Sequence, residues 1–348
     1  MNNKVTIQDI ADALGISRNT VSKAINNSSG LAEATRERIL QKAVEMGYKS
    51  FSYAGAFSNV FSSSAEKNKE PEYMGEIALL SGTFLTQSHF ASLMLDKMQQ
   101  ELSQLGYTLN THRVSPLNLE TKTLPLTLRL ENVKAILCIE MFDLDYDNML
   151  CGLGKPILFV DGPSKHNGKA LWADQIYMDN TTEITRLVFN LLDKGYSRIG
   201  FVGDYTHCQS FYERYSAYYQ ALINAGQTPD PKYIIRNLAS EDILKAIREM
   251  DRLPDVFLCA NDFVALDLLA ALKCIGKKVP DDVRVCGFDD SAESRMITPP
   301  LTTIHIHSQV TAFSAVQLLI SRINEPSLDY RILHTQTDLI YRESCPEE

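Results

Sequence analysis

The sequence lacks the features that mark membrane-spanning, secreted and disulfide-rich proteins. No apolar run approaches the roughly 18 residues that a membrane span needs. A secretory signal has a basic segment, then an apolar stretch, then a cleavage site of small residues, and the N-terminal stretch MNNKVTIQDI does not show this order. The seven cysteines are odd in number and have no C-x-x-C spacing, which argues against a disulfide framework and a zinc site. We therefore expect a cytoplasmic protein with no membrane partner.

The usual signatures of catalysis are also missing. The C-G-L-G stretch at 151–154 lacks the third glycine of a dinucleotide loop, and the chain has neither a G-K-[ST] phosphate loop nor a G-x-S-x-G elbow. His305 and His307 alternate along a predicted strand, but no third ligand accompanies them and we interpret them as surface histidines. We predict that the protein is not an enzyme and uses no cofactor or metal.

Length and charge indicate more than one domain. At 348 residues the chain exceeds the roughly 100–200 residues of a typical domain, which predicts a small module and a large one. The net charge of −9 is uneven, because residues 1–50 contain seven Lys or Arg against five Asp or Glu, a balance of +2. A mildly basic head on an acidic body is compatible with a module that binds nucleic acid.

The first fifty residues carry signals for two short helices joined by a turn. Thr6 is a hydroxyl cap followed three residues later by Asp9, which is typical of a helix start. Apolar residues recur at positions 7, 10, 11 and 14 until Gly15 ends the helix, and Ser17 caps the next one. In that second helix positions 21, 24 and 25 are apolar, which leaves four polar side chains outside near its start: Arg18, Asn19, Ser22 and Lys23.

This arrangement favours a helix-turn-helix, whose second helix enters the major groove of DNA. Arg18 suits the edge of guanine and Asn19 that of adenine. A plain helical hairpin is the alternative, and these features alone leave the two interpretations equally open. A third helix is expected at about 33–46, where it would support the first two.

Residues 5–26 read VTIQDIADALGISRNTVSKAIN and fit the pattern V-T-[IL]-x-[DE]-[IV]-A-x-x-[AL]-G-[VI]-S-x-x-T-V-S-[RK]-x-[IVL]-N. With this match, residues 5–48 resemble the DNA-binding head of the lactose/galactose repressor family. The resemblance places Arg18, Asn19 and Lys23 at specificity positions. In all, the head residues that it implies as DNA contacts are Thr6, Ser17, Arg18, Asn19, Thr20, Ser22, Lys23 and Asn26.

The connector departs from the family. Where relatives have a hinge helix that wedges a Leu into the minor groove, this chain keeps only Ala54 and places Phe57 at the wedge position. Phe57 could intercalate, or it could pack on the core, and the two alternatives stay open. Gly55 in place of Arg lowers helix propensity. We count Ala54 and Phe57 among the predicted DNA contacts.

From Glu76 onward, short apolar runs alternate with helical stretches. The runs are EIALL, AILCI, ILFV, RIGFVG, VFLCA and VRVCGF, and the helices are expected near 89–105, 180–194, 211–225, 261–275 and 308–323. Such alternation predicts parallel sheets covered by helices, which bind ligands beyond the carboxyl ends of their strands. Polar residues follow several runs at these ends: Asp161, Asp204, Asn261, Asp262, Asp289 and Asp290.

The resemblance continues through this region in GYSRIGFVG (195–203), the segment 259–290 and PPLTTI (299–304). It implies an α/β two-lobed periplasmic-binding-protein-like core behind an all-α helix-turn-helix head. The effector-binding residues that it implies are His89, Phe90, Asp161, Arg214, Asn261 and Asp289. For Asn261 and Asp290, capping of the next helix is an equally open alternative. Trp172 is expected in a lobe core or hinge rather than against a sugar ring.

The predicted domains are a head at 1–49, a hinge and linker at 50–73, and a core at 74–348. Within the core we expect lobe 1 at about 74–172 and 305–324, and lobe 2 at about 173–304 and 325–343. The predicted function is a sequence-specific transcriptional repressor that binds double-stranded, pseudo-palindromic operator DNA as a homodimer or tetramer. A small-molecule effector, a sugar or sugar derivative, would gate it. The alternative is a cytoplasmic solute or sugar sensor with little DNA binding of its own.

Overall fold

The computed structural model describes residues 6–25, 35, 36, 38, 39, 42, 43, 46, 72–82 and 89–347, the side chains of 89–93 excepted. The chain divides into two compact units, Met1–Glu72 and Tyr73–Glu348. The predictions for Asn26, Ala54 and Phe57 lie outside the described residues, as does nearly all of the hinge and linker.

The head contains the two predicted helices, α1 (Ile7–Leu14) and α2 (Arg18–Ile25). Thr6 and Asp9 form a reciprocal capping box, and Gly15 ends α1 at a φ of 65°, in the left-handed region that glycine adopts most readily. The side chains that pack together between the helices are Ile10, Ala11, Val21 and Ala24, joined by Ile39 and Ala43. The described residues 35, 36, 38, 39, 42 and 43 are helical, at the place predicted for a third helix.

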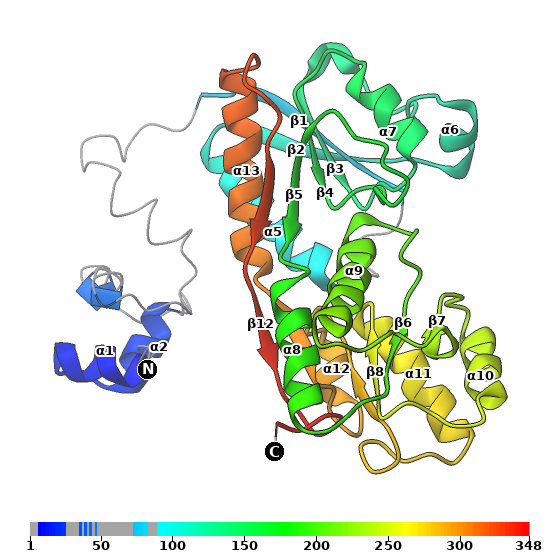
Figure 1. The fold of residues 1–348 in the computed structure, drawn as a ribbon. Coiled ribbons are helices and arrows are strands. Elements are labelled where there is room, and N and C mark those ends of the chain that lie inside the picture. Colours follow the sequence, from blue (N-terminus) through cyan, green and yellow to red (C-terminus); the bar gives the residue numbers. More distant parts are fainter. Residues whose placement is uncertain are drawn as a thin grey trace. The chain divides into compact units, whose positions relative to one another are not determined.

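The second unit has two lobes, each built on a parallel sheet (Figure 1). Lobe 1 has six strands in the order β11-β5-β4-β3-β1-β2. Their bounds are β1 (Gly75–Ser81), β2 (Tyr107–Arg113), β3 (Val133–Ile139), β4 (Ile157–Val160), β5 (Asp174–Met178) and β11 (Ile332–Thr335). Apolar side chains on one face pack against α5 (His89–Gln104) and α13 (Ser308–Asn324), and those on the other pack against α7 (Leu144–Cys151). A short helix α6 (Pro116–Thr121) and a 3₁₀ turn (Leu130–Asn132) complete this lobe.

Lobe 2 has four parallel strands in the order β7-β6-β8-β9. Their bounds are β6 (Ile199–Val202), β7 (Ile234–Ile235), β8 (Val256–Cys259) and β9 (Arg284–Cys286). One face packs on α8 (Thr182–Asp193) and α9 (Gln209–Asn224), and the other on α10 (Ser240–Glu249) and α11 (Asp262–Cys274). The remaining elements are a 3₁₀ turn (Pro231–Tyr233), α12 (Ala292–Met296) and an antiparallel pair, β10 (Thr303–Ile306) with β12 (Thr337–Ile340).

The chain passes between the lobes three times: after β5, after β10 and after β11. Two of these passages are bonded to each other, because Asp179 N donates to Thr335 O at 2.7 Å and Thr337 Oγ1 donates to Asp179 O at 3.0 Å. The lobes therefore share a short, cross-linked hinge, which suits rotation of one lobe against the other.

The predicted alternation of strands and helices is confirmed, but the expected lobe boundaries differ from the structure. Strand β5, expected in lobe 2, pairs with β4 in lobe 1, and β11 pairs in turn with β5. Strand β11 lies far in sequence from the other strands of this sheet, so no local pattern assigns it. Trp172 is 68% exposed, so its predicted place in a lobe core is wrong. In the parts of the chain that are described, no helix is long and apolar enough to cross a membrane.

Candidate functional site

The outer face of α2 presents the polar side chains predicted to read DNA. Arg18, Asn19 and Lys23 are exposed, whereas Val21 and Ala24 on the opposite side are buried. A helix with one apolar side held by its neighbour and one polar side open to solvent can enter a groove without unfolding.

The hydroxyl side chains of the head have structural roles of their own. Ser17 Oγ accepts from Thr20 N at 3.1 Å and lies 2.7 Å from Thr20 Oγ1, so Ser17 caps α2. Thr6 Oγ1 donates to Asp9 at 2.7 Å within the capping box of α1. Ser22 is half-buried just past the middle of α2. Contacts of these residues with DNA remain predictions.

In the core, Arg214 is the centre of a buried cluster at the junction of the lobes. It is 3% exposed, and its Nε donates to Asn180 Oδ1 at 2.9 Å while Nη1 donates to the Ala260 carbonyl at 2.6 Å. Nη1 also lies 3.7 Å from Asp289 Oδ1, and the guanidinium stacks over the Phe288 ring at 3.5 Å. Among the described residues, Nη2 has no hydrogen-bond partner. The guanidinium is thus oriented rigidly and keeps one nitrogen for a ligand.

Asp161 and Asp289 lie near this guanidinium, at the carboxyl ends of β4 and β9. Both have positive φ values, 53° and 116°, which are strained for residues other than glycine. Burial raises the pKa of Asp161 to about 6 and that of Asp289 to about 8, although the nearby charge of Arg214 opposes both shifts. A half-buried carboxyl group with an incomplete set of partners favours hydrogen bonds from a ligand's hydroxyl groups.

Asp161 also links the lobes. Its Oδ1 accepts from Gly162 N at 2.9 Å and from Ser210 N, at the start of α9 in lobe 2, at 3.3 Å. Gln209 N donates to Gly162 O at 2.9 Å across the same junction. A ligand that competes for Asp161 would therefore alter a contact between the lobes.

The other predicted strand-end residues have different roles. Asn261 accepts from Val264 N at 3.0 Å and caps α11, which is the alternative left open by the sequence. Asp290 caps no helix and instead binds Arg295 and Arg342, with Oδ2 2.9 Å from His305 Nδ1. Although burial would raise the pKa of Asp290, these partners hold it well below its usual range. Asp262 accepts from Thr303 and the Ser291 backbone, so it too stabilises the lobe.

Three residues of this region escaped the sequence analysis. Glu140 directly follows β3 at a φ of 52°, and its charge acts on Asp289; its place after the run AILCI could have identified it. Asn180 holds Arg214 but follows β5, a strand that the sequence did not reveal. Phe142 of lobe 1 contacts His207 of lobe 2, with ring centroids 4.9 Å apart. His89 and Phe90 begin α5, but their side chains are not among those described.

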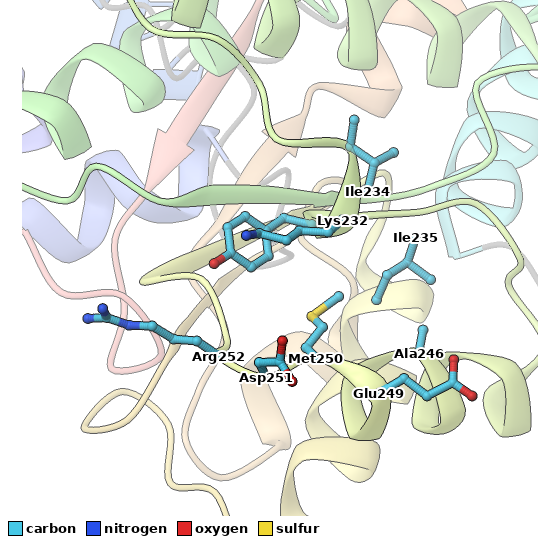
Figure 2. Close-up of a pocket in the computed structure, with 9 residues that line it drawn as sticks. Lys232, Ile234, Ile235, Ala246, Glu249, Met250, Asp251 and Arg252 are labelled. Carbon is cyan, nitrogen blue, oxygen red and sulfur yellow. The ribbon is translucent and has the colours of Figure 1, made fainter.

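Hollows lie at both ends of the strands of lobe 2. The first, of about 390 Å³, lies at the amino ends of β7 and β8 beside the last turn of α10, and Figure 2 shows its charged margin at Lys232, Glu249 and Arg252. No predicted site residue lines it. The second, of about 410 Å³, lies at the carboxyl ends of the strands and is lined by Asn261. Ligands of open α/β sheets bind at the carboxyl ends of the strands, so we expect the ligand site at the end of the sheet where the second hollow lies.

The Arg214 cluster consists of groups that act by charge and by hydrogen bonds, since Arg214 pairs with Asp289 and Asp161 accepts from the Ser210 backbone. In the described part of the chain, no group of three His, Cys, Asp or Glu side chains could hold a metal ion. The cluster can orient a polar molecule by hydrogen bonds and can couple its binding to the lobe junction.

Comparison with known protein families matches two segments of the chain. Residues 6–50 match the family described as "Bacterial regulatory proteins, lacI family", and residues 188–345 match "Periplasmic binding protein-like domain". The HTH-type transcriptional regulator GalR of Lacticaseibacillus casei is 27% identical over 351 residues, covering 97% of this chain and 99% of GalR. The HTH-type transcriptional repressor PurR of Aliivibrio salmonicida (strain LFI1238) is 27% identical over 356 residues, covering 97% of this chain and 98% of PurR.

Two solved structures share the fold over nearly the whole chain. The cellobiose complex of the transcriptional regulator CelR has a TM-score of 0.67 at 23% identity and covers 98% of this chain and 99% of its own. The lac repressor dimer bound to operator and the anti-inducer ONPF has a TM-score of 0.67 at 21% identity, and the match covers 99% of this chain and 100% of the lac repressor chain. The predicted fold class is confirmed by these matches.

The relatives are regulators of transcription and not enzymes, in agreement with the prediction from the missing catalytic signatures. The matched head, the matched core and the order in which they occur leave one assignment. The chain combines a helix-turn-helix domain of the lacI family with a periplasmic-binding-protein-like domain, and it is similar over nearly its whole length to regulators of transcription.

Proposed function

We propose that the protein is a cytoplasmic repressor that binds a pseudo-palindromic operator as a homodimer and is gated by a sugar or sugar derivative. Residues 1–49 would bind DNA, and residues 74–348 would bind the effector between the lobes. Residues 50–73 would form the hinge and linker that connects these two parts. The observation that carries the proposal is Arg214, a buried guanidinium at the lobe junction with one nitrogen left for a ligand.

The head supports the DNA half of this proposal through the exposed polar face of α2. Two such heads in a symmetric dimer would read two half-sites in successive major grooves, so the operator should share the dimer's two-fold symmetry. Arg18 and Asn19 would contact base edges, while Ser17, Thr20 and Ser22 would contact phosphates.

The core supports the gating half through contacts that cross the lobe junction. Asp161 is bonded to Ser210, and Phe142 packs on His207. An effector that binds Arg214, Asp161 and Asp289 together would favour one arrangement of the lobes over another and so bias how the heads are presented to DNA. The coupling expected between two such sites is about 1–3 kcal/mol.

The first test is selection of bound sequences from random duplex DNA by the purified full-length protein at physiological salt, because salt determines how much binding is purely electrostatic. Enrichment of a two-fold symmetric motif would support a dimeric sequence reader. No enrichment, with or without added sugars, would favour the alternative of a solute sensor with little DNA binding of its own.

The second test removes the guanidinium. Arg214→Ala should abolish the effect of effector on operator binding while operator affinity itself stays near normal, which also shows that the variant is folded. Arg186→Ala is the matched control, because Arg186 is 54% exposed on α8 and its ion-pair partner is Glu183, which is not part of the Arg214 cluster. An unchanged response of Arg214→Ala at the same effector concentration would refute the assignment of the site.

A further inference from the structure

The thiols of Cys286 and Cys345 meet in the core of lobe 2, although the two residues are far apart in the sequence. Cys286 is the last residue of β9, and Cys345 lies in the segment that follows β12. Both side chains belong to the same buried apolar cluster. The Cys286 thiol donates a hydrogen bond to the sulfur of Cys345. A disulfide requires two cysteines whose side chains meet, and this pair fulfils that condition.

Backbone contacts hold the two cysteines together. The N of Val285, directly before Cys286, donates to Ser344 O at 3.3 Å, and Ser344 Oγ donates to Val285 O at 2.6 Å. Thr302 joins both segments, because its Oγ1 donates to Cys345 O at 2.7 Å and its backbone forms a parallel bridge with Cys286. The contact between the thiols therefore results from hydrogen bonds among three segments of the chain.

The two thiols differ in acidity. The hydrogen bond from Cys286 lowers the pKa of Cys345, although burial opposes the shift. The positive charges of Arg284 and Lys194 also favour the Cys345 thiolate. Burial raises the pKa of Cys286 well above its usual value. Because the thiolate is the nucleophile in thiol–disulfide exchange, Cys345 suits the attacking role and Cys286 the resolving role.

The turn that carries Cys345 lies next to solvent. Cys345 itself is 1% exposed, but Glu343, Pro346 and Glu347 beside it are exposed. Within this turn Cys345 N donates to Arg342 O at 3.3 Å. Opening of a short surface turn costs less free energy than opening of a core strand, so a small oxidant can reach Cys345 while the lobe stays folded.

We propose that Cys286 and Cys345 form a reversible disulfide, and that the oxidant is a low-molecular-weight disulfide such as oxidised glutathione. The Cys345 thiolate attacks one glutathione sulfur, so that a Cys345–glutathione bond forms and a glutathione thiolate leaves. This thiolate takes the proton of Cys286, whose sulfur then attacks the Cys345 sulfur and expels the second glutathione as a thiolate. Two protein thiols are oxidised, and one glutathione disulfide is reduced to two glutathiones. The modification site is separate from the proposed effector site and does not depend on the proposed function.

The disulfide would tie the segment of Cys345 to the strand that leads to the Arg214 cluster. Phe288, which stacks on Arg214, and Asp289 directly follow β9 and Gly287 in the chain. Oxidation would therefore restrain the lobe 2 side of that cluster. In a reducing compartment the pair would stay reduced until small disulfides accumulate.

Peptide mapping of the folded full-length protein tests the proposal. The protein is incubated at neutral pH with an excess of oxidised glutathione, alkylated, and digested with trypsin without reduction. Trypsin separates the two cysteines, because residues 285–295 and 343–348 are tryptic peptides with one cysteine each. These peptides should be joined by a disulfide in most of the protein, and dithiothreitol should separate them.

Serine variants test the role of each thiol. Cys286→Ser should accumulate a Cys345–glutathione adduct, because no second thiol resolves it, whereas Cys345→Ser should leave Cys286 unmodified. Cys274→Ser is the matched control, since Cys274 is exposed at the end of α11 and its loss should leave the disulfide intact. Circular dichroism of each variant checks that it is folded.

Recovery of Cys286 and Cys345 as free thiols would overturn the proposal if Cys274 of the same sample carries glutathione, because the oxidant would then be active. A disulfide from Cys286 to Cys259 of the neighbouring strand β8 would overturn it as well. So would a Cys286–Cys345 disulfide that forms only in urea, because the folded contact would then not be its cause.

Discussion

Asp147 offers a quantitative test of the buried electrostatics of lobe 1. It lies in α7 with its side chain completely buried, and in the described structure neither carboxylate oxygen has a hydrogen-bond partner. Burial, helped by the charge of Asp143, raises the pKa of Asp147 from 3.8 to about 8. At pH 7 this carboxyl group is therefore protonated in the folded protein and ionised in the unfolded chain.

The sign and size of the effect follow from this shift. Because the folded state holds the extra proton, the contribution of Asp147 to stability is greatest below pH 3.8 and is lost as the pH rises toward about 8. Each pH unit in that window costs about 1.4 kcal/mol, which amounts to an upper limit of about 4 kcal/mol at pH 7. Asp147→Asn removes the ionisable group but leaves a buried amide, which costs about 1–3 kcal/mol when unpaired.

The assay is urea unfolding of both proteins at pH 5, 6, 7 and 8, followed by circular dichroism. The free energy of unfolding of Asp147→Asn, relative to that of the original protein, should rise by up to about 1.4 kcal/mol per pH unit. Asp145→Asn is the control on the same helix, because the Asp145 side chain is 69% exposed and its effect should stay within about 0.5 kcal/mol at every pH. A difference for Asp147→Asn that does not change with pH would refute the reasoning.

Two further predictions concern the head and the buried Asp174–Arg322 pair of lobe 1. Asn19→Ala should remove the preference at one base pair of each half-site, worth about 1–3 kcal/mol, while binding to unrelated DNA stays unchanged; binding-site selection on the variant measures this, and an unaltered motif would contradict the assignment. Asp174→Ala should destabilise the core by about 3–5 kcal/mol in urea unfolding, because the buried Arg322 loses its carboxylate partner and keeps only backbone carbonyls as acceptors. Asp174 accepts from Arg322 at 2.8 and 3.0 Å and from the Arg331 backbone at 2.7 Å, so a loss below about 1 kcal/mol would show that this pair is solvated.

Local signals in the sequence were sufficient for the head and for much of the core. The helices of the head begin and end through contacts between residues close in sequence: the capping box of Thr6 and Asp9, the turn at Gly15 and the cap at Ser17. The sequence alone therefore predicts where these helices begin and end. The same holds for the apolar strands of both sheets and for Asp161 and Asp289 at their ends, because a parallel sheet collects its carboxyl ends at one edge.

Only the tertiary structure decided which distant segments meet. In the structure, β5 and β11 belong to the sheet of lobe 1. Asn180 and the Ala260 carbonyl both bind Arg214. Asp290, a possible helix cap by sequence, instead binds Arg342. These outcomes depend on strand order and on contacts between residues far apart in the chain. Packing selects such contacts from many that the local sequence allows equally well. Because these long-range contacts produce no periodic pattern in the sequence, the sequence alone does not predict them.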